Sequence, residues 1–247
     1  DQGIEAALMT EPLPHNATIL KEPRHSASIR VVNMLILEPE ELSAPLPPGD
    51  KRTIHIMSIL RKGPGDTLLA GTTDGMIGQA RILSTGDEGV ALAFEPEREA
   101  PPLAPVTLVL GFPRPIQANR ILKDLTSLGV GGIVMCGTEL GEKSYTQSTF
   151  FKNREWRAAL LEGAAQAASP RLPEVHTEWT LARALASLSG SADITGTERR
   201  LAFDPYRGKG TIASMMHMSP GHHEAVATVS TEGYTRPRSM VLAIGSE

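Results

Sequence analysis

The second half of the chain alternates short apolar runs with segments of helical periodicity, and this alternation constrains the fold more than any other feature. Residues 106–110 (VTLVL) form an almost continuous aliphatic run, which is typical of a strand buried on both faces. A helix is predicted over residues 115–128 and a second strand over 133–136. Strands and helices that alternate in this way predict a parallel α/β sheet.

The same alternation continues toward the end of the sequence. Apolar and small residues recur at helical spacing from Trp156 to Ala167, and Pro170 ends that helix. The remaining predictions are a strand at Val175, a helix over 181–188, and strands over 200–203, 224–230 and 240–245. No repeat of fixed period is present.

A proline-rich acidic passage over residues 95–105 separates this half from one of different texture, and it is typical of an interdomain linker. Before it, short apolar runs at 33–37, 67–71, 78–83 and 89–94 are separated by Gly and Asp turns, with one helix around 52–60. This pattern predicts a small β-barrel. We therefore expect three parts: an N-terminal arm over 1–32, a β-barrel over 33–100 and an α/β domain over 101–247.

Composition restricts the class of protein. The longest apolar runs fall short of the ~18–20 residues of a membrane helix, so no membrane association is expected. The single cysteine, Cys136, excludes an internal disulfide, fits a reducing compartment and is interpreted as a buried core thiol. The net charge is −4, but residues 1–100 hold 9 Lys and Arg against 15 Asp and Glu, whereas residues 101–247 hold 15 against 13. If the chain binds RNA, local basic patches must do so.

The last predicted strand leads directly into Gly245, Ser246 and Glu247. Open α/β sheets bind ligands beyond the carboxyl ends of their strands, and glycine lets the backbone approach a ligand closely. A nucleotide-like cofactor is expected here, although an ordinary strand end explains these residues equally well. Because a domain seldom finishes on an exposed apolar strand, we expect the sequence to stop within this domain.

Three basic residues surround the start of the helix predicted over 115–128: Arg114, Arg120 and Lys123. Arginine forks and helix N-terminal N–H groups both suit phosphate, whereas a solvated charged face is the commoner origin of such a cluster.

Two other candidate motifs are excluded by their sequence context. The glycines of residues 129–132 lie between a helix and a strand, the reverse of a dinucleotide-binding loop. His222 and His223 lack partners with metal-ligand spacing, so no metal site is predicted.

In their order and spacing these segments resemble the bacterial small-subunit (16S) ribosomal RNA uracil-N3 methyltransferases, a branch of the knotted SPOUT superfamily. The resemblance runs from Asn33 to Glu247. It departs from the family pattern at Ser127, Leu140 and Ser246. It rests on residues 33–42, His55, residues 59–61, Gly65, Asp66, residues 111–130, Thr138, Glu139, Trp156, Glu162, Gln166, Arg171, Pro173, Val175 and residues 244–247.

The resemblance implies an α/β fold with an N-terminal PUA-like β-barrel and a C-terminal SPOUT domain containing a trefoil knot, which is incomplete if the sequence stops early. It implies a cytoplasmic homodimer that binds S-adenosyl-L-methionine in the knot and methylates uracil N3 in small-subunit rRNA during ribosome biogenesis. It assigns no catalytic residue here. The implied cofactor-binding residues are Phe203, Asp204, Ile244, Gly245, Ser246 and Glu247, and the implied RNA-binding residues are Arg61, Arg114, Arg120, Lys123 and Arg171.

One other reading stays open, and a third is weaker. A non-catalytic RNA-binding or ribosome-assembly protein could keep this fold without the methyl-donor site, which the departures at Ser127, Leu140 and Ser246 favour. A methyltransferase of another α/β class would need a glycine-rich loop after its first strand, and residues 111–115 (GFPRP) do not supply one.

Overall fold

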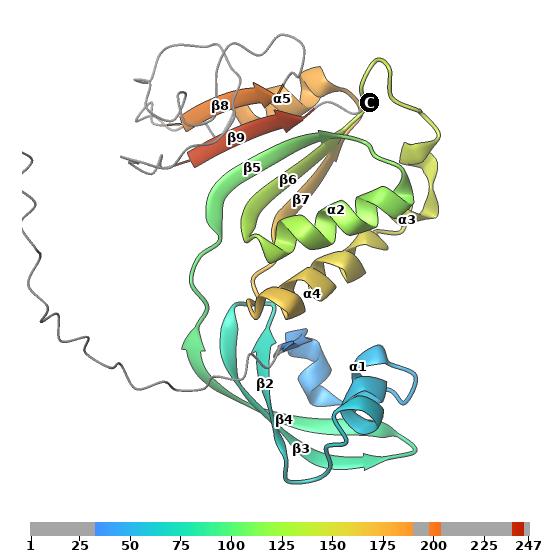
Figure 1. Ribbon diagram of the computed structural model, residues 1–247, viewed down its shortest axis with the longest axis vertical. Helices are drawn as coiled ribbons and strands as arrows, with labels where there is room; N and C mark the ends of the chain where they lie inside the picture. Colours follow the sequence, from blue (N-terminus) through green and yellow to red (C-terminus); the bar gives the residue numbers. More distant parts are fainter. Residues whose placement is uncertain (1–32, 190–197, 204–238, 245–247) are drawn as a thin grey trace, which may run out of the picture. The chain divides into compact units, whose positions relative to one another are not determined.

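The computed structural model describes residues 33–189, 198–203 and 239–244, which form two sheets (Figure 1). The first sheet contains β1 (Leu35–Leu37), β2 (Thr67–Thr72), β3 (Met76–Gly86) and β4 (Gly89–Glu99), in that spatial order. β1 runs parallel to β2, and the other neighbours are antiparallel. The short strands predicted for this half are confirmed, and β3 and β4 are longer than expected.

The first sheet is open in the described part of the chain, where no pairing joins β1 to β4. The helix predicted around residues 52–60 consists of α1 (Lys51–Ile54) and the π-helical turn η2 (His55–Ile59), preceded by the 3-10 turn η1 (Pro39–Ser43). Ile56 of η2 is buried in one cluster with side chains from β1, β3 and β4. A helical segment therefore covers the apolar face that closure into a barrel would otherwise have buried, and the predicted barrel is not seen.

The predicted linker is shorter than expected. Residues 95–99 extend β4, and β5 (Ala104–Gly111) begins before the predicted linker ends, so only residues 100–103 connect the sheets. Pro96, which cannot donate a backbone hydrogen bond, lies at a register shift opposite Gly78 on the edge strand β4. Edge strands and bulges are the positions where a sheet tolerates proline.

The second sheet confirms the predicted parallel α/β architecture. It contains β5, β6 (Val130–Cys136), β7 (Glu174–Glu178), β8 (Glu198–Phe203) and β9 (Ser239–Ile244), all parallel, in the order β7-β6-β5-β9-β8. The strand predicted over 224–230 lies outside the described residues. The predicted knot depends on residues 204–238 and 245–247, which also lie outside them, so the knot stays a prediction.

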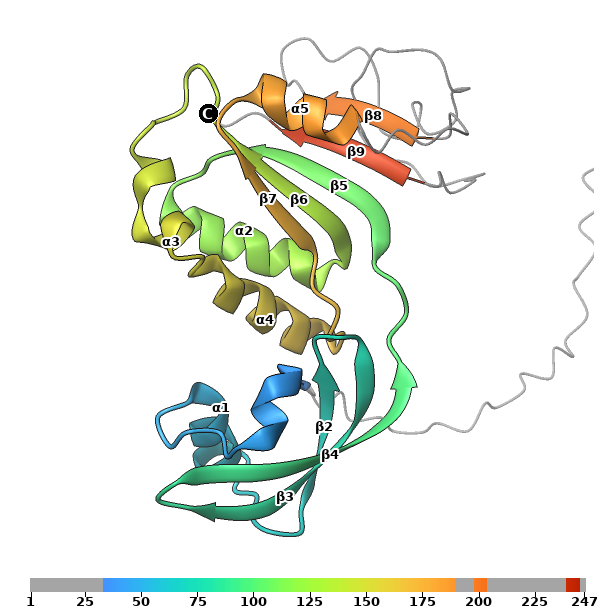
Figure 2. The same cartoon turned by 180° about the vertical axis from the view of Figure 1, so that it is seen from behind.

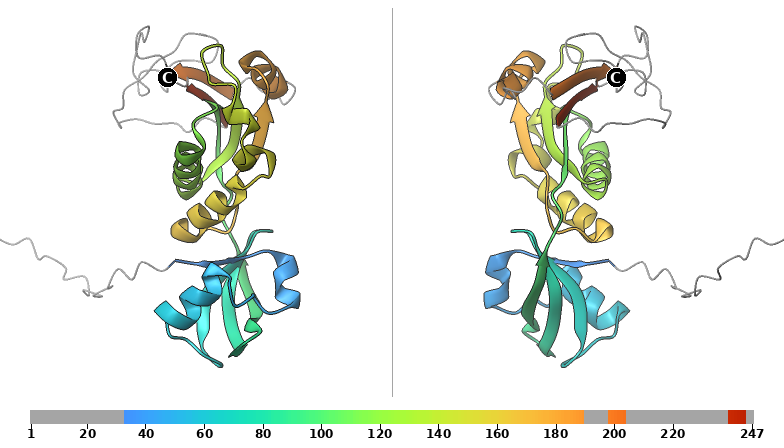
Figure 3. Two further views of the ribbon diagram at one scale, coloured as in Figure 1. Left: turned by 90° about the vertical axis from the view of Figure 1, so that its right-hand side faces the viewer. Right: turned by 90° about the vertical axis from the view of Figure 1, so that its left-hand side faces the viewer.

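Helices cover both faces of the second sheet (Figures 2 and 3). α2 (Pro115–Ser127) and α4 (Trp156–Ala167) pack against one face, where Leu108 and Leu110 of β5 join their apolar side chains. α5 (Leu181–Ser189) packs against the opposite face, where Val109 lies. The alternation of 108, 109 and 110 between the two cores is the two-residue period of a strand buried on both sides. η3 (Tyr145–Gln147) and α3 (Thr149–Lys152) connect β6 to α4.

The predicted turn at Gly129 is confirmed. Gly129 has φ +74° just after α2, a conformation that side-chain-bearing residues adopt at a cost. The three residues that follow belong to β6 rather than to a ligand-binding loop.

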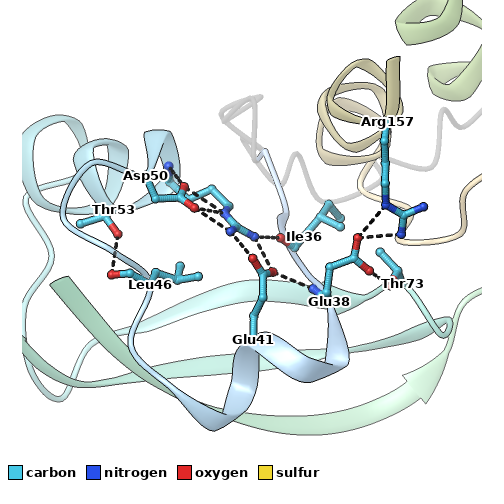
Figure 4. A network of polar contacts seen from close by, with 9 residues as sticks. Ile36, Glu38, Glu41, Leu46, Asp50, Thr53, Thr73 and Arg157 are labelled. Atoms are coloured by element: carbon cyan, nitrogen blue, oxygen red, sulfur yellow. Dashed lines mark hydrogen bonds and ion pairs between the residues drawn. The ribbon is translucent and has the colours of Figure 1, made fainter. Parts of the chain in front are cut away.

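Residues from the first sheet contact α4 and the segment after it. The amide of Met34 donates to the carbonyl of Ala165 at 3.0 Å. Arg157 of α4 forms an ion pair with Glu38 at 2.7 Å, and Thr73 also donates a hydrogen bond to Glu38 (Figure 4). Beside this contact, Arg52 donates to the carboxylates of Glu41 and Asp50, and these hydrogen bonds hold the pKa of both carboxyls below the usual range.

Candidate functional site

The carboxyl ends of the parallel strands meet along one edge of the second sheet. Their register aligns Leu110 with Ile244, Gly111 with Cys136, Cys136 with Glu178, and Phe203 with Ile244. The last residues of the five strands therefore lie along a single edge, which we call the carboxyl edge.

The strand order places a topological switch point at β5. The chain moves outward from β5 to β6 and β7 on one side, whereas β9 and β8 lie on the other. Ligands of open α/β sheets bind in the crevice at such a reversal, beyond the strand ends. The candidate site therefore lies between the ends of β5 and β9, next to Gly111 and Ile244.

Two of the predicted cofactor-binding residues occupy this edge. Phe203 and Ile244 are register partners at the ends of β8 and β9. Asp204, Gly245, Ser246 and Glu247, the other four predicted contacts, lie outside the described residues. Their cofactor role stays a prediction.

Phe112 fixes the segment that leaves β5. Its amide donates to the carbonyl of Cys136 at 3.0 Å, and its buried ring packs edge-on against Phe151, with centroids 4.9 Å apart. Arg114 follows two residues later as the N-cap of α2, and Pro115 at the first helical position needs no N–H partner. A rigid turn thus places the exposed Arg114 beside the switch point.

Tyr145 contacts Arg114 directly. The Nε of Arg114 donates to the Tyr145 hydroxyl at 3.0 Å, which joins the N-cap of α2 to the loop after β6. This geometry leaves an exposed guanidinium whose other N–H groups can meet a phosphate or an anionic base. The sequence analysis missed Tyr145, since the only signal was a single aromatic residue within a polar loop.

The other predicted RNA-binding residues do not gather around Arg114. Arg120 lies 3.8 Å from Asp124 on the exposed side of α2, and Lys123 lies 3.6 Å from Glu162 of α4. Arg171 donates from Nε to the carbonyl of Ala100 at 3.0 Å. Arg61 is exposed on the first half with φ +51°. Of the five, Arg114 alone lies at the carboxyl edge, and the RNA-binding role of each stays a prediction.

Cys136 is a core thiol, as predicted. It is buried at the end of β6, and burial raises its pKa, so it is held as the neutral thiol. Within the described residues no group of three His, Cys, Asp or Glu side chains could hold a metal ion. His222 and His223 lie outside the described ranges. No helix among the described segments is long and apolar enough to cross a membrane.

A family model described as "RNA methyltransferase domain" matches residues 99–247, which include the whole second sheet. The chain belongs to this family. It is 39% identical over 146 residues to the ribosomal RNA small subunit methyltransferase E of Treponema pallidum, a match that covers 58% of this chain and 55% of the relative. It is 29% identical over 148 residues to ribosomal RNA small subunit methyltransferase E 1 of Borreliella burgdorferi, covering 58% and 60%. The chain thus spans less than two thirds of either relative.

A solved structure shares the fold. The ribosomal RNA small subunit methyltransferase E of Neisseria gonorrhoeae, bound to S-adenosyl methionine, superposes with a TM-score of 0.61 over 86% of this chain and 79% of its own. The sequence identity is 15%. This likeness concerns the fold, whereas the family assignment rests on residues 99–247.

Proposed function

We propose that this chain belongs to an enzyme that transfers a methyl group from S-adenosyl-L-methionine to uracil N3 in small-subunit ribosomal RNA. The observation that carries the proposal is the family match over 99–247, which includes the switch point between β5 and β9. The Treponema relative named for small-subunit rRNA and the solved relative with bound S-adenosyl methionine support the substrate and the donor.

The carboxyl edge is where a nucleotide-like donor would bind. Leu110 and Ile244 are register partners at the ends of β5 and β9, and the donor would lie beyond these strand ends. Phe203 would hold the donor with Ile244, together with the predicted Asp204, Gly245, Ser246 and Glu247. When bound, S-adenosyl-L-methionine supplies an electrophilic methyl group on a sulfonium.

Arg114 would act on the RNA side of the donor site. Its guanidinium would hold a backbone phosphate and stabilise the uracil anion that forms as the N3 proton passes to water. The hydrogen bond that Arg114 donates to the Tyr145 hydroxyl fixes the direction of the guanidinium. Alignment of the methyl donor and the acceptor would supply much of the acceleration. The uracil edge must be unpaired to react, so an exposed or extruded base is the substrate form. We further propose a homodimer that works in the cytoplasm.

The test uses this chain beside the full-length product of the same gene. S-adenosyl-L-methionine is titrated calorimetrically into each, and each is incubated with small-subunit rRNA and labelled donor. We expect micromolar donor binding by the full-length protein, and a product that stops reverse transcription because an N3 methyl group blocks base pairing. Binding of RNA without donor binding in either protein would refute the enzyme and support a non-catalytic RNA-binding relative.

The matched variants are Arg114→Ala and Arg81→Ala. Both remove an exposed arginine, but Arg81 lies on the first sheet and pairs with Glu95 at 3.4 Å. We expect loss of methylation in the first variant and wild-type methylation in the second. Equal activity of both variants would remove Arg114 from the proposed mechanism.

A further inference from the structure

An exposed tryptophan follows β7 at the carboxyl edge. Trp179 comes directly after Glu178, the last residue of β7, and 74% of it is exposed. The other tryptophan, Trp156, is 9% exposed and belongs to the core under α4. A large exposed aromatic ring beside a candidate site offers a flat apolar surface with a polar N–H handle, which suits a stacked ligand.

The backbone that carries the Trp179 indole is fixed. The amide of Gly137 donates to the carbonyl of Glu178 at 3.1 Å, and a Cβ on Gly137 would lie 2.3 Å from the Trp179 carbonyl oxygen. On the other side, the Thr180 hydroxyl accepts from the Arg183 amide at 3.2 Å at the start of α5. The ring therefore projects from a rigid junction between a strand and a capped helix, which keeps the entropic cost of binding low.

Trp179 lies at a defined offset from the switch point. In the order β7-β6-β5-β9-β8 it is two strands from the end of β5 and three from the end of β9. With strands about 4.8 Å apart, these offsets are roughly 10 and 14 Å. A base seated between β5 and β9 lies beyond the reach of the indole, whereas a base on a neighbouring nucleotide of the same strand can meet it.

We infer that Trp179 stacks on a nucleobase flanking the target nucleotide; this inference rests on the proposed function. Unpaired RNA bases stack readily on aromatic rings, and the contact tolerates any base because every base has a π-face. Two exposed arginines belong to segments that start at this edge: Arg114 after β5, and Arg183 in the first turn of α5, where it pairs with Glu178 at 3.2 Å. The strand's phosphates would run past these arginines while one base covers the indole.

A second copy of the chain is the alternative occupant. Leu181 and Leu185 of α5 are 41% and 38% exposed and lie one helical turn apart. A protein partner that covered Trp179 through an apolar face would gain from these leucines, whereas a stacked base would not need them. Leu185→Ala is therefore the variant that separates the two occupants.

The test titrates a short single-stranded RNA containing the target uridine into the full-length protein while tryptophan fluorescence and RNA anisotropy are recorded. We expect quenching in the wild type, about tenfold weaker RNA binding in Trp179→Ala, and near wild-type affinity without the quenching in Trp179→Phe. The slope of log affinity against log salt should be the same in Trp179→Ala as in the wild type, because no phosphate contact is removed. Leu128→Ala, an exposed apolar residue at the opposite end of α2, should leave binding unchanged.

Each remaining outcome decides a different point. Wild-type RNA affinity in Trp179→Ala, with methylation intact, overturns the stacking and leaves the proposed function standing. Loss of self-association in both Trp179→Ala and Leu185→Ala, seen by sedimentation, assigns the ring to a protein interface and overturns the stacking. Failure of the wild type to bind RNA overturns the proposed function and this inference together.

Discussion

At the scale of single residues, Arg52 stabilises the first half of the chain through charge-assisted hydrogen bonds. It donates to Glu41, to Asp50 and to the carbonyl of Ile36 at 2.9 Å, and all three charged side chains are at most 30% exposed. Arg52→Ala should lower the free energy of unfolding by about 2–3 kcal/mol, because two partly buried carboxylates lose their partner. Urea unfolding at pH 7 measures this loss. Arg81→Ala, which removes an exposed pair, should cost less than about 0.5 kcal/mol.

The same residues predict a pH dependence with a definite sign. The pKa values of Glu41 and Asp50 are lower in the folded chain than their ordinary values of 4.5 and 3.8, chiefly because Arg52 donates to both. Their stabilisation is therefore present above about pH 4.5 and is lost as the pH falls through the folded values. The difference in unfolding free energy between wild type and Arg52→Ala should shrink between pH 5 and pH 3. A difference that stays constant over this range would contradict the assignment.

At the scale of elements, α2 and α4 approach closely because α4 has a glycine at the contact. A Cβ on Gly163 would lie 2.4 Å from the Lys123 carbonyl oxygen and 2.8 Å from the Thr126 Cβ. Ser127, at the position where the sequence departs from the family's acidic residue, also reaches this contact and donates to the Gly163 carbonyl at 3.2 Å. Gly163→Ala should therefore destabilise by about 1–3 kcal/mol despite the higher helix propensity of alanine.

Thermal unfolding measures the Gly163→Ala effect. The matched control is Gln166→Ala, an alanine introduced at an exposed position of the same helix, which should change the free energy by less than about 0.5 kcal/mol. A Gly163→Ala variant as stable as the wild type would show that α2 and α4 can move apart without cost.

The elements of the second sheet were predictable because the pattern of apolar residues within each segment reflects which faces of that segment are buried. The run 106–110 has no polar alternation since Leu108 and Val109 face different cores. The open form of the first sheet was not predictable in this way, because no local pattern shows that Ile56 packs against that sheet. At the site, the sequence pointed to Ile244 because this residue ends the last predicted strand just before a glycine. Tyr145 was not predicted, because its role depends on a tertiary contact with Arg114. Trp179 was missed because its exposure is a property of the folded edge.

At the scale of the whole molecule, Arg171 connects the two sheets. It follows α4, donates to the carbonyl of Ala100 at 3.0 Å, lies 3.8 Å from Glu99, and its guanidinium occupies the space where a Cβ on Gly75 would be. The two described sheets belong to one compact unit. We therefore expect the two sheets to unfold in one cooperative transition, with Arg171 contributing to their coupling.

Two probes report on different sheets and so test this coupling. Both tryptophans belong to the second half, so their fluorescence follows the second sheet, and exchange of the amides of Ile82 and Val90 follows the first. The two should give one midpoint in the wild type. Arg171→Ala should lower the free energy of unfolding by about 2 kcal/mol, because the Ala100 carbonyl loses its donor, and it should separate the two midpoints. Arg171→Lys keeps the charge but not the planar fork, so its free energy of unfolding should lie between those of the wild type and Arg171→Ala. If Arg171→Ala instead keeps wild-type stability but lowers the salt dependence of RNA binding, Arg171 is a phosphate contact, and the coupling must come from Glu38 and Arg157.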